Sequence, residues 1–163
     1  MLLAKAKSLE LSRLTLYKNS ASKIISPDGK TVLLFLARSE EMHFDMLKKE
    51  VTKLKKLNRL DVKNLLKMPI IPLFKRKELR FNHTSSSFVG DINIIKTAIN
   101  VEKKDAPFYA KIAKETPSRD GKKLFLTLKN AEVGHLILLK KKLRDMQGAS
   151  AGLSEMQAHK KLF

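Results

Sequence analysis

Two short motifs of the same kind, Glu-x-x-His, are notable in the sequence because their side chains can bind metal ions. One motif is Glu40 with His43, and the other is Glu132 with His135. A spacing of three residues places both side chains of a motif on one face of a helix. The chain has no Cys, which excludes disulfides, thiolate metal sites and iron–sulfur centres. Any metal must therefore be held by carboxylate oxygens and imidazole nitrogens.

The two motifs belong to an internal repeat with an offset of 92 residues. The forty positions 10–49 contain fourteen identities with the positions 92 residues later, where chance pairing would give roughly two or three. The repeat predicts two copies of one unit, at about 1–57 and 92–147. The aligned pairs include chemically distinctive residues: Glu10 with Glu102, Tyr17 with Tyr109, Glu40 with Glu132 and His43 with His135.

Each copy is predicted to form a helical hairpin. Apolar residues recur at close to heptad spacing over 2–24, which indicates a helix with one buried stripe. A second helix is expected over 30–57, with Phe35, Leu36 and Leu47 facing inward. The turn signals between the helices are Ser26-Pro27-Asp28-Gly29 and Ser118-Arg119-Asp120-Gly121, with Ser26 or Asp28 as the cap in the first copy.

The connection between the copies indicates the overall topology. Residues 58–91 join the hairpins, and a connection this long is uncommon unless it crosses the length of a bundle. We therefore predict an all-α protein, a ferritin-like four-helix bundle over 1–147 made of two repeated helical hairpins with a long crossover. Residues 148–163 are expected to form a flexible tail.

The apolar stripes place the acidic residues of the repeat in the interior. Four buried carboxylates would be prohibitively costly without compensation, and two divalent cations supply four positive charges. One Glu from each of two helices and Glu-x-x-His from the other two form the ligand set of di-iron and di-manganese carboxylate bundles. We predict two iron ions, with manganese or zinc as alternatives, bound by Glu10, Glu40, His43, Glu102, Glu132 and His135.

Because two such motifs are each preceded at the same distance by Glu and Tyr, the chain resembles the rubrerythrin branch of the ferritin-like superfamily over 1–57 and 92–147. The resemblance implies a centre that reacts with peroxide or oxygen, since rubrerythrins reduce hydrogen peroxide. It also implies that Glu40 and Glu132 bridge the metals and that Glu10 and Glu102 are terminal ligands. By the same resemblance, His43 and His135 each cap one metal, and Tyr17 and Tyr109 donate hydrogen bonds to the carboxylates.

The sequence departs from that family pattern in two ways. Rubrerythrins carry a further ligand Glu three residues after the third-helix Glu, and this position is Asp105, which is one methylene shorter. Asp105 is therefore a weaker candidate ligand, with solvation or pairing with a Lys as the alternative, and its counterpart Arg13 is expected as a charge at the surface or behind the ligands. Rubrerythrins often carry a Cys-containing rubredoxin-like domain, so here the electron donor is expected to be a separate protein or molecule.

The net charge of +18 and the pI near 10.1 leave other functions open. One alternative is a ferroxidase or iron-handling protein with the same centre. Another is a nucleic-acid-binding bundle with a structural metal, although few aromatic residues lie among the lysine runs to stack on bases. No apolar run approaches the roughly 20 residues that span a bilayer, so we expect no membrane partner. We expect a cytoplasmic homodimer, in which the long connection permits hairpins to swap between chains.

Overall fold

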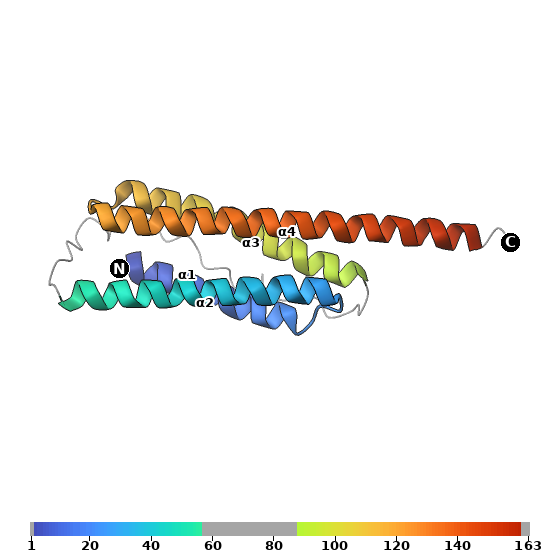
Figure 1. The fold of residues 1–163 in the computed structure, drawn as a ribbon, viewed down its shortest axis with the longest axis horizontal. Coiled ribbons are helices and arrows are strands. Elements are labelled where there is room, and N and C mark those ends of the chain that lie inside the picture. Colours follow the sequence, from blue (N-terminus) through green and yellow to red (C-terminus); the bar gives the residue numbers. More distant parts are fainter. Residues whose placement is uncertain (1, 57–87, 161–163) are drawn as a thin grey trace.

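The computed structural model describes residues 2–56 and 88–160, which form four α-helices and, within these ranges, no strand. The helices are α1 (Leu2–Ala21), α2 (Pro27–Lys56), α3 (Phe88–Glu115) and α4 (Arg119–Lys160). α1 packs along α2 and α3 packs along α4 (Figure 1). The predicted all-α bundle of two repeated hairpins is confirmed. The predicted crossover lies outside the described residues except for 88–91, which form the start of α3.

Both hairpins turn through the same capped loop. The hydroxyl of Ser26 accepts a hydrogen bond from the backbone N–H of Gly29 at 3.1 Å, and the hydroxyl of Ser118 accepts one from Gly121 at 2.9 Å. Each serine therefore caps a backbone donor that the first turn of a helix leaves unpaired. Packing is close at Gly29, because a Cβ there would lie 2.5 Å from Ile24 Cδ1 and would push this side chain aside.

A buried carboxylate ties the first turn to the second hairpin. Asp91, near the start of α3, accepts hydrogen bonds from the backbone N–H groups of Ile25 at 2.9 Å and Ser26 at 2.7 Å. These donors lie in the loop before α2 and receive no helical partner. Asp91 is 3% exposed, so the contact fixes one end of the first hairpin against the other hairpin.

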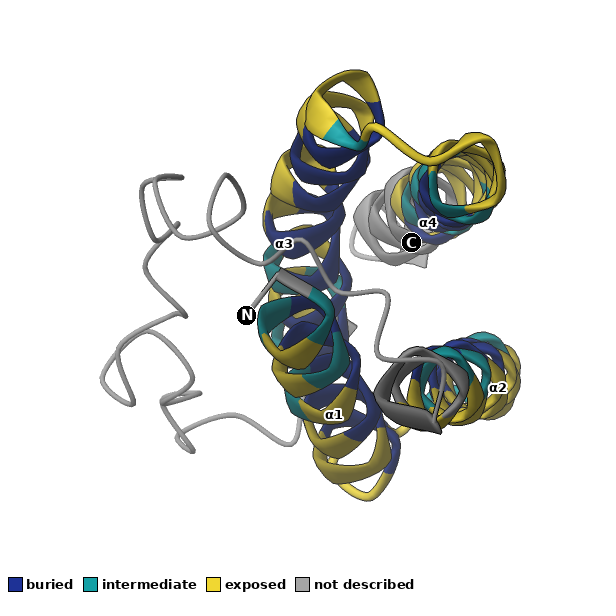
Figure 2. Cartoon of the chain, turned by 90° about the vertical axis from the view of Figure 1, so that its left-hand side faces the viewer, coloured by how far each residue is buried: buried dark blue, intermediate teal, exposed yellow. Residues whose placement is uncertain are grey.

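The interior contains two apolar clusters. On each helix, the predicted ligands lie in sequence between the residues of one cluster and those of the other. The inner faces of the four helices are buried (Figure 2). On every helix, one cluster precedes the ligand residues and the other follows them. The first cluster includes Leu14, Tyr17, Leu36, Ile95 and Leu139, and the second includes Leu9, Leu47, Tyr109, Ile112 and Leu128. The two clusters are related by the offset of 92 residues: Tyr17, Leu36 and Leu139 of the first correspond to Tyr109, Leu128 and Leu47 of the second. This is the relation expected if a two-fold axis passes through the ligand layer.

Two sequence predictions about the helices are wrong in detail. Phe35 is 57% exposed, because Leu33 and Leu36 already occupy the inward face of α2. The last helix does not end near residue 147, since α4 continues to Lys160. The segment predicted as a tail contains three Ala and two Leu, which favour helix, and the cost of roughly 1 kcal/mol for each of Gly148 and Gly152 is too small to end it.

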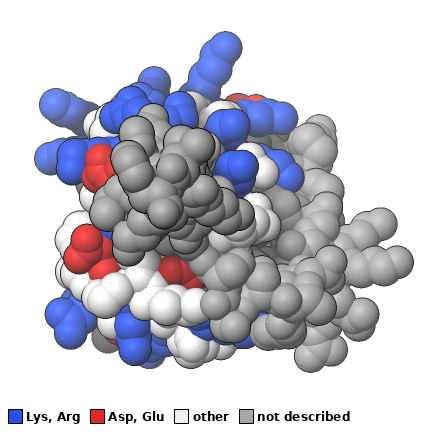
Figure 3. Space-filling model, turned by 90° about the vertical axis from the view of Figure 1, so that its right-hand side faces the viewer, with Lys and Arg blue, Asp and Glu red and all other residues white. Residues whose placement is uncertain are grey.

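The outer surface carries the excess positive charge. At the end of the bundle where α4 projects, Lys and Arg side chains are spread over the described surface, with a few acidic side chains between them (Figure 3). Among the described helices, none is long and apolar enough to cross a membrane.

Candidate metal centre

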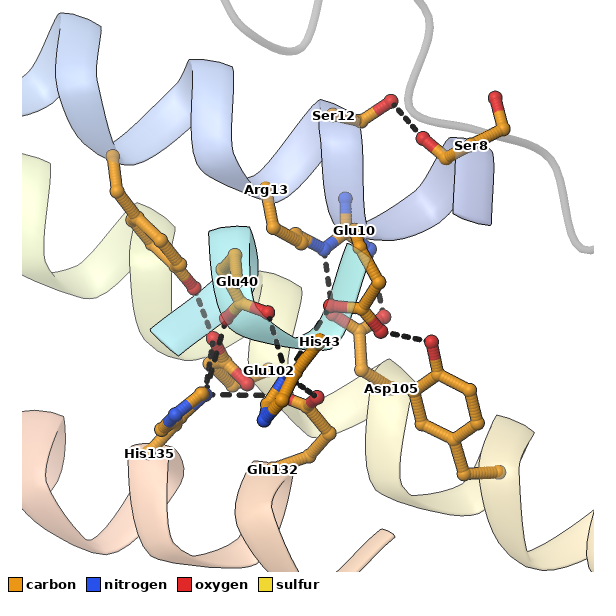
Figure 4. A network of polar contacts seen from close by, with 12 residues as sticks. Ser8, Glu10, Ser12, Arg13, Glu40, His43, Glu102, Asp105, Glu132 and His135 are labelled. Carbon is orange, nitrogen blue, oxygen red and sulfur yellow. Dashed lines mark hydrogen bonds and ion pairs between the residues drawn. The ribbon is translucent and has the colours of Figure 1, made fainter. Parts of the chain in front are cut away.

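The structure brings all six predicted ligands together in one buried layer (Figure 4). None is more than 8% exposed. All four helices contribute, so the layer joins the two hairpins. α1 supplies Glu10, α2 supplies Glu40 and His43, α3 supplies Glu102, and α4 supplies Glu132 and His135.

The ligand atoms form two overlapping groups of four. Within each group, one donor atom from each residue lies within 4.8 Å of the others. Glu40 and Glu132 belong to both groups. Their carboxylates are therefore the part of the layer that the two groups share. The first group is completed by Glu10 and His43, which we call the His43 half, and the second by Glu102 and His135, which we call the His135 half.

Each imidazole directs one nitrogen at three carboxylates. His43 Nδ1 lies 3.2 Å from Glu40, 3.4 Å from Glu10 and 3.4 Å from Glu132. His135 Nδ1 lies 3.0 Å from Glu132, 3.1 Å from Glu40 and 3.7 Å from Glu102. The two rings stack with centroids 5.6 Å apart. The two halves thus repeat one geometry, and Nδ1 is the nitrogen that each ring offers to the centre.

Four oxygens of this layer have no hydrogen bond from any described residue. They are buried carboxylate oxygens, one from each Glu, and leaving such atoms unsatisfied is costly. Two divalent cations would satisfy them and would neutralise the four carboxylates. The mixture of carboxylates and imidazoles suits iron, manganese or zinc. The residues therefore fit a pair of such ions: the oxygens are Glu10 Oε2, Glu40 Oε1, Glu102 Oε2 and Glu132 Oε1.

The electrostatics of the layer keep protons on its bases when no cation competes for them. Burial alone would lower the pKa of both imidazoles, but the surrounding carboxylates outweigh it and raise the pKa of His43 to about 11 and that of His135 to about 12. Burial raises the pKa of Glu102 to about 8 and that of Glu40 well above its ordinary value. At Glu132 the two nearby histidines outweigh the effect of burial, and its pKa falls to about 2.

Two tyrosines contact the unshared carboxylates. The hydroxyl of Tyr17 on α1 donates a hydrogen bond to Glu102 on α3, and the hydroxyl of Tyr109 on α3 donates one to Glu10 on α1. Both rings are completely buried. Burial and the neighbouring carboxylates raise the pKa of both phenols well above the usual value, so the hydroxyls stay protonated and remain donors. Each tyrosine thus orients a Glu of the opposite hairpin.

Asp105, the weaker candidate ligand, belongs to neither group of donor atoms. Arg13 donates to both of its oxygens, from Nε at 2.5 Å and from Nη2 at 2.7 Å. Arg13 is 4% exposed, so it is not a surface charge, and Asp105 is paired with this arginine rather than with a Lys or with solvent. Burial raises the pKa of Asp105 to about 6 although Arg13 opposes the shift. The pair neutralises itself and leaves the four Glu as the charge to be balanced.

Sequence reasoning missed Ser39. Its hydroxyl oxygen lies 2.8 Å from Nε2 of His135, the ring nitrogen that faces away from the carboxylates. Ser39 directly precedes Glu40, yet the residue 92 positions later is Ala131. A search for residues that repeat therefore could not find it.

A bundle of two antiparallel hairpins with Glu and Glu-x-x-His in its interior places the protein in the ferritin-like class of carboxylate proteins. The chain belongs to the rubrerythrin family, whose model, Rubrerythrin, matches residues 2–147.

Two solved structures resemble this fold. A hypothetical protein from Pyrococcus furiosus shares 22% identity with a TM-score of 0.67, covering 90% of this chain and 89% of that chain. A bacterioferritin-related protein from Bacteroides fragilis, described as a dodecameric thioferritin, shares 17% identity with a TM-score of 0.65, covering 92% and 86%. At these identities the likeness shows the fold alone. No curated protein matches the sequence.

Proposed function

We propose that the protein is a di-iron enzyme that reduces hydrogen peroxide or dioxygen with electrons from a separate donor. One observation carries the proposal: four unsatisfied, buried carboxylate oxygens and two imidazole nitrogens converge in a layer flanked by apolar clusters. Membership in the rubrerythrin family supports iron over other divalent ions. Two bound ferrous ions would supply two electrons and Lewis acidity for cleavage of an O–O bond, so that peroxide, two electrons and two protons give two water molecules.

The residues of the chain have separate tasks in this proposal. Glu40 and Glu132 would contribute to holding both ions, and Tyr17 and Tyr109 keep the unshared carboxylates aimed at the centre through their hydroxyl hydrogen bonds. The apolar clusters on either side keep bulk water from the layer. A dry site strengthens these electrostatic contacts and protects the reacting groups from side reactions.

The electrons must come from outside this sequence. With no Cys, the chain has no ligands for an iron–sulfur or rubredoxin-like centre. The net charge of +18 attracts acidic proteins by long-range steering. We therefore propose an acidic redox protein as the donor, and reduction should slow as salt screens the attraction.

Anaerobic iron loading followed by peroxide addition tests the proposed function. We expect about two ferrous ions per chain by metal analysis, and their oxidation by one equivalent of peroxide in an optical titration. Glu40→Ala should lose both properties, whereas Glu41→Ala is the matched control, because Glu41 is the exposed neighbour that contacts Lys18. Fewer than two ions per chain in the unaltered protein, or no oxidation by peroxide, would overturn the proposal.

Iron storage is the second candidate function, and the likeness to a protein described as a dodecameric thioferritin favours considering it. An excess of ferrous iron supplied in air separates the two functions. A storage protein forms a large shell and keeps a ferric mineral, whereas a peroxide-reducing enzyme stops after its own two ions are oxidised. Size-exclusion chromatography with iron analysis of the protein peak distinguishes these results.

Binding of nucleic acid through the basic surface remains a third proposal, in which the metal has only a structural role. The spread of basic side chains over the face in Figure 3 supports weak and diffuse attraction there. A gel-shift series with a DNA duplex tests this directly. Binding that survives physiological salt would favour this function, whereas loss of binding as salt rises indicates non-specific attraction.

We also propose that the protein is a homodimer, with or without exchange of hairpins. Large apolar side chains remain exposed on α2 and α4, including Phe35 at 57%, Met42 at 66% and Ile137 at 62%. Covering them would remove apolar surface from water. Light scattering of the unaltered protein and of Phe35→Lys should give a dimer and a monomer respectively.

A further inference from the structure

One position at which the repeat is broken contacts a candidate ligand directly. All six candidate ligands and both tyrosines have identical partners 92 residues away, but Ser39 corresponds to Ala131. Ser39 lies on α2 and is 9% exposed, and its hydroxyl reaches across to His135 on α4 at 2.8 Å. The contact therefore joins the two hairpins at the level of the ligands.

The chemistry of imidazole gives this contact a consequence for metal binding. His135 presents Nδ1 to the carboxylates, so an ion bound in the His135 half requires the lone pair of Nδ1 and leaves the proton on Nε2. The Ser39 oxygen is placed to accept a hydrogen bond from that N–H. In that role the hydroxyl supports the tautomer that can bind metal and restrains the rotation of the ring. Ser39 is thus a positioning residue that acts through His135.

His43 receives no such support within the described part of the chain. No described residue makes a hydrogen bond to its Nε2. The residue that corresponds to Ser39 in the second copy is Ala131, whose methyl group cannot accept a hydrogen bond. Both rings are largely buried, since His43 is 8% exposed and His135 5%. Among the described residues, the hydroxyl contact distinguishes the Nε2 of His135 from that of His43.

We propose that Ser39 makes the two halves of the centre unequal, so that the first divalent ion binds in the His135 half and the His43 half fills second and exchanges faster. This inference rests on the proposed function only in requiring that the layer binds a pair of divalent ions. Hydrogen-bond partners of metal-bound histidines contribute roughly 10- to 100-fold to metal affinity, and we expect the His135 half to be tighter by a factor in this range.

A zinc titration of the full metal-free chain, followed by NMR of ¹⁵N-labelled histidine, tests the order of filling. Zinc is redox-inert, so the readout does not depend on turnover. At one equivalent, the Nδ1 signal of His135 should move to its zinc-bound position while that of His43 stays largely unchanged. Equal occupancy of both rings, or filling of His43 first, would overturn the inference alone. Zinc bound at neither ring would overturn the metal pair as well.

Variants at Ser39 and Ala131 distinguish an effect of the hydroxyl on the histidine ring from an effect on the stability of the fold. Ser39→Ala should remove the preference for His135, and Ser39→Thr, which keeps a hydroxyl, should restore it. Ala131→Ser should tighten the His43 half, and the double variant Ser39→Ala with Ala131→Ser should reverse the order of filling. Ser20→Ala is the matched control, because it removes another buried serine hydroxyl away from the histidines. An unchanged order in Ser39→Ala would refute the role of the hydroxyl.

Discussion

Arg13 and Asp105 occupy the same position in the two copies of the repeat and form a buried ion pair with each other. The pair spans α1 and α3, so one hairpin supplies the cation and the other the anion. A two-fold axis brings equivalent positions together only where they lie close to the axis. The contact therefore marks the axis and shows that the two copies have diverged on it.

Removing one member of this pair should destabilise the metal-free protein. We expect Arg13→Met to cost about 3–5 kcal/mol, since it leaves the buried Asp105 without its partner. Exchanging the residues, as Arg13→Asp with Asp105→Arg, should recover most of that loss, because the repeat gives each residue an equivalent setting. Urea denaturation measures both variants. Lys18→Met, which breaks the exposed pair with Glu41, is the control and should change little. If the double variant Arg13→Asp with Asp105→Arg is as unstable as Arg13→Met, the two positions do not have equivalent surroundings.

Asp105 should be dispensable for metal stoichiometry. Asp105→Asn retains a polar group for Arg13 but cannot act as a carboxylate ligand, and we expect about two ions per chain as in the unaltered protein. Glu102→Gln, three residues earlier, should lose an ion because Glu102 belongs to the ligand cluster. Metal analysis after equilibrium dialysis compares the two variants. Loss of an ion in Asp105→Asn would identify it as a ligand after all.

The tyrosine hydroxyls should affect the two halves separately. Tyr17→Phe removes the donor to Glu102 and should weaken the His135 half, whereas Tyr109→Phe removes the donor to Glu10 and should weaken the His43 half. The expected loss is roughly 10- to 100-fold in affinity for the affected ion. Because phenylalanine preserves the ring, packing is largely unchanged. The zinc-shifted signals of the two histidines report which half is weakened, and identical effects of both variants on both halves would argue against this assignment.

Metal binding should release protons and weaken as the pH falls. The pKa values of about 11 for His43 and about 12 for His135 mean that both rings carry a proton on Nδ1 at pH 7 without metal, and Glu102, at about 8, is mostly protonated. Ions that bind these groups must displace those protons. We expect about two to three protons released per metal pair near pH 7, so the affinity rises with pH in this range. Calorimetry in buffers with different ionisation enthalpies counts the protons, and a release below one would contradict the pKa pattern.

A glycine next to the centre offers a test of helix energetics. Gly134 lies in α4 between Glu132 and His135, and a Cβ there would meet nothing within 4 Å among the described atoms. Gly134→Ala should therefore stabilise the protein by roughly 0.5–1 kcal/mol. Gly29→Ala should give no such gain, since its Cβ would press on Ile24 Cδ1 at 2.5 Å. Urea midpoints compare the two, and a destabilised Gly134→Ala would show a close contact at that site.

The sequence was sufficient to predict features that repeat. Glu-x-x-His fixes two side chains on one helical face, and the matching Glu and Tyr of each copy indicate a common interior, so the meeting of the six side chains was predictable. That these six side chains bind metal ions remains a proposal. The capped turns at Ser26 and Ser118 were also predictable, because their hydrogen bonds are local in sequence.

Features that break the repeat, or that depend on contacts between helices, could not be predicted in this way. Asp91 bonds to backbone groups of a distant loop, and Ser39 reaches a ring on another helix. The partner of Asp105 depends on the axis between the hairpins rather than on any local motif. The outward position of Phe35 depends on which of several neighbouring apolar residues face the interior. The length of α4 depends on how far a run of helix-forming residues continues as a helix.

The two-fold relation between the two halves of the centre has an evolutionary consequence. A gene for one hairpin would suffice to build such a layer as a dimer, but every substitution would then appear on both sides of the axis. Joining two copies in one chain removes that constraint. An arginine can then face an aspartate, and a serine can support one imidazole without a symmetry-related copy, so a chain that carries both hairpins has two sites that can change one at a time.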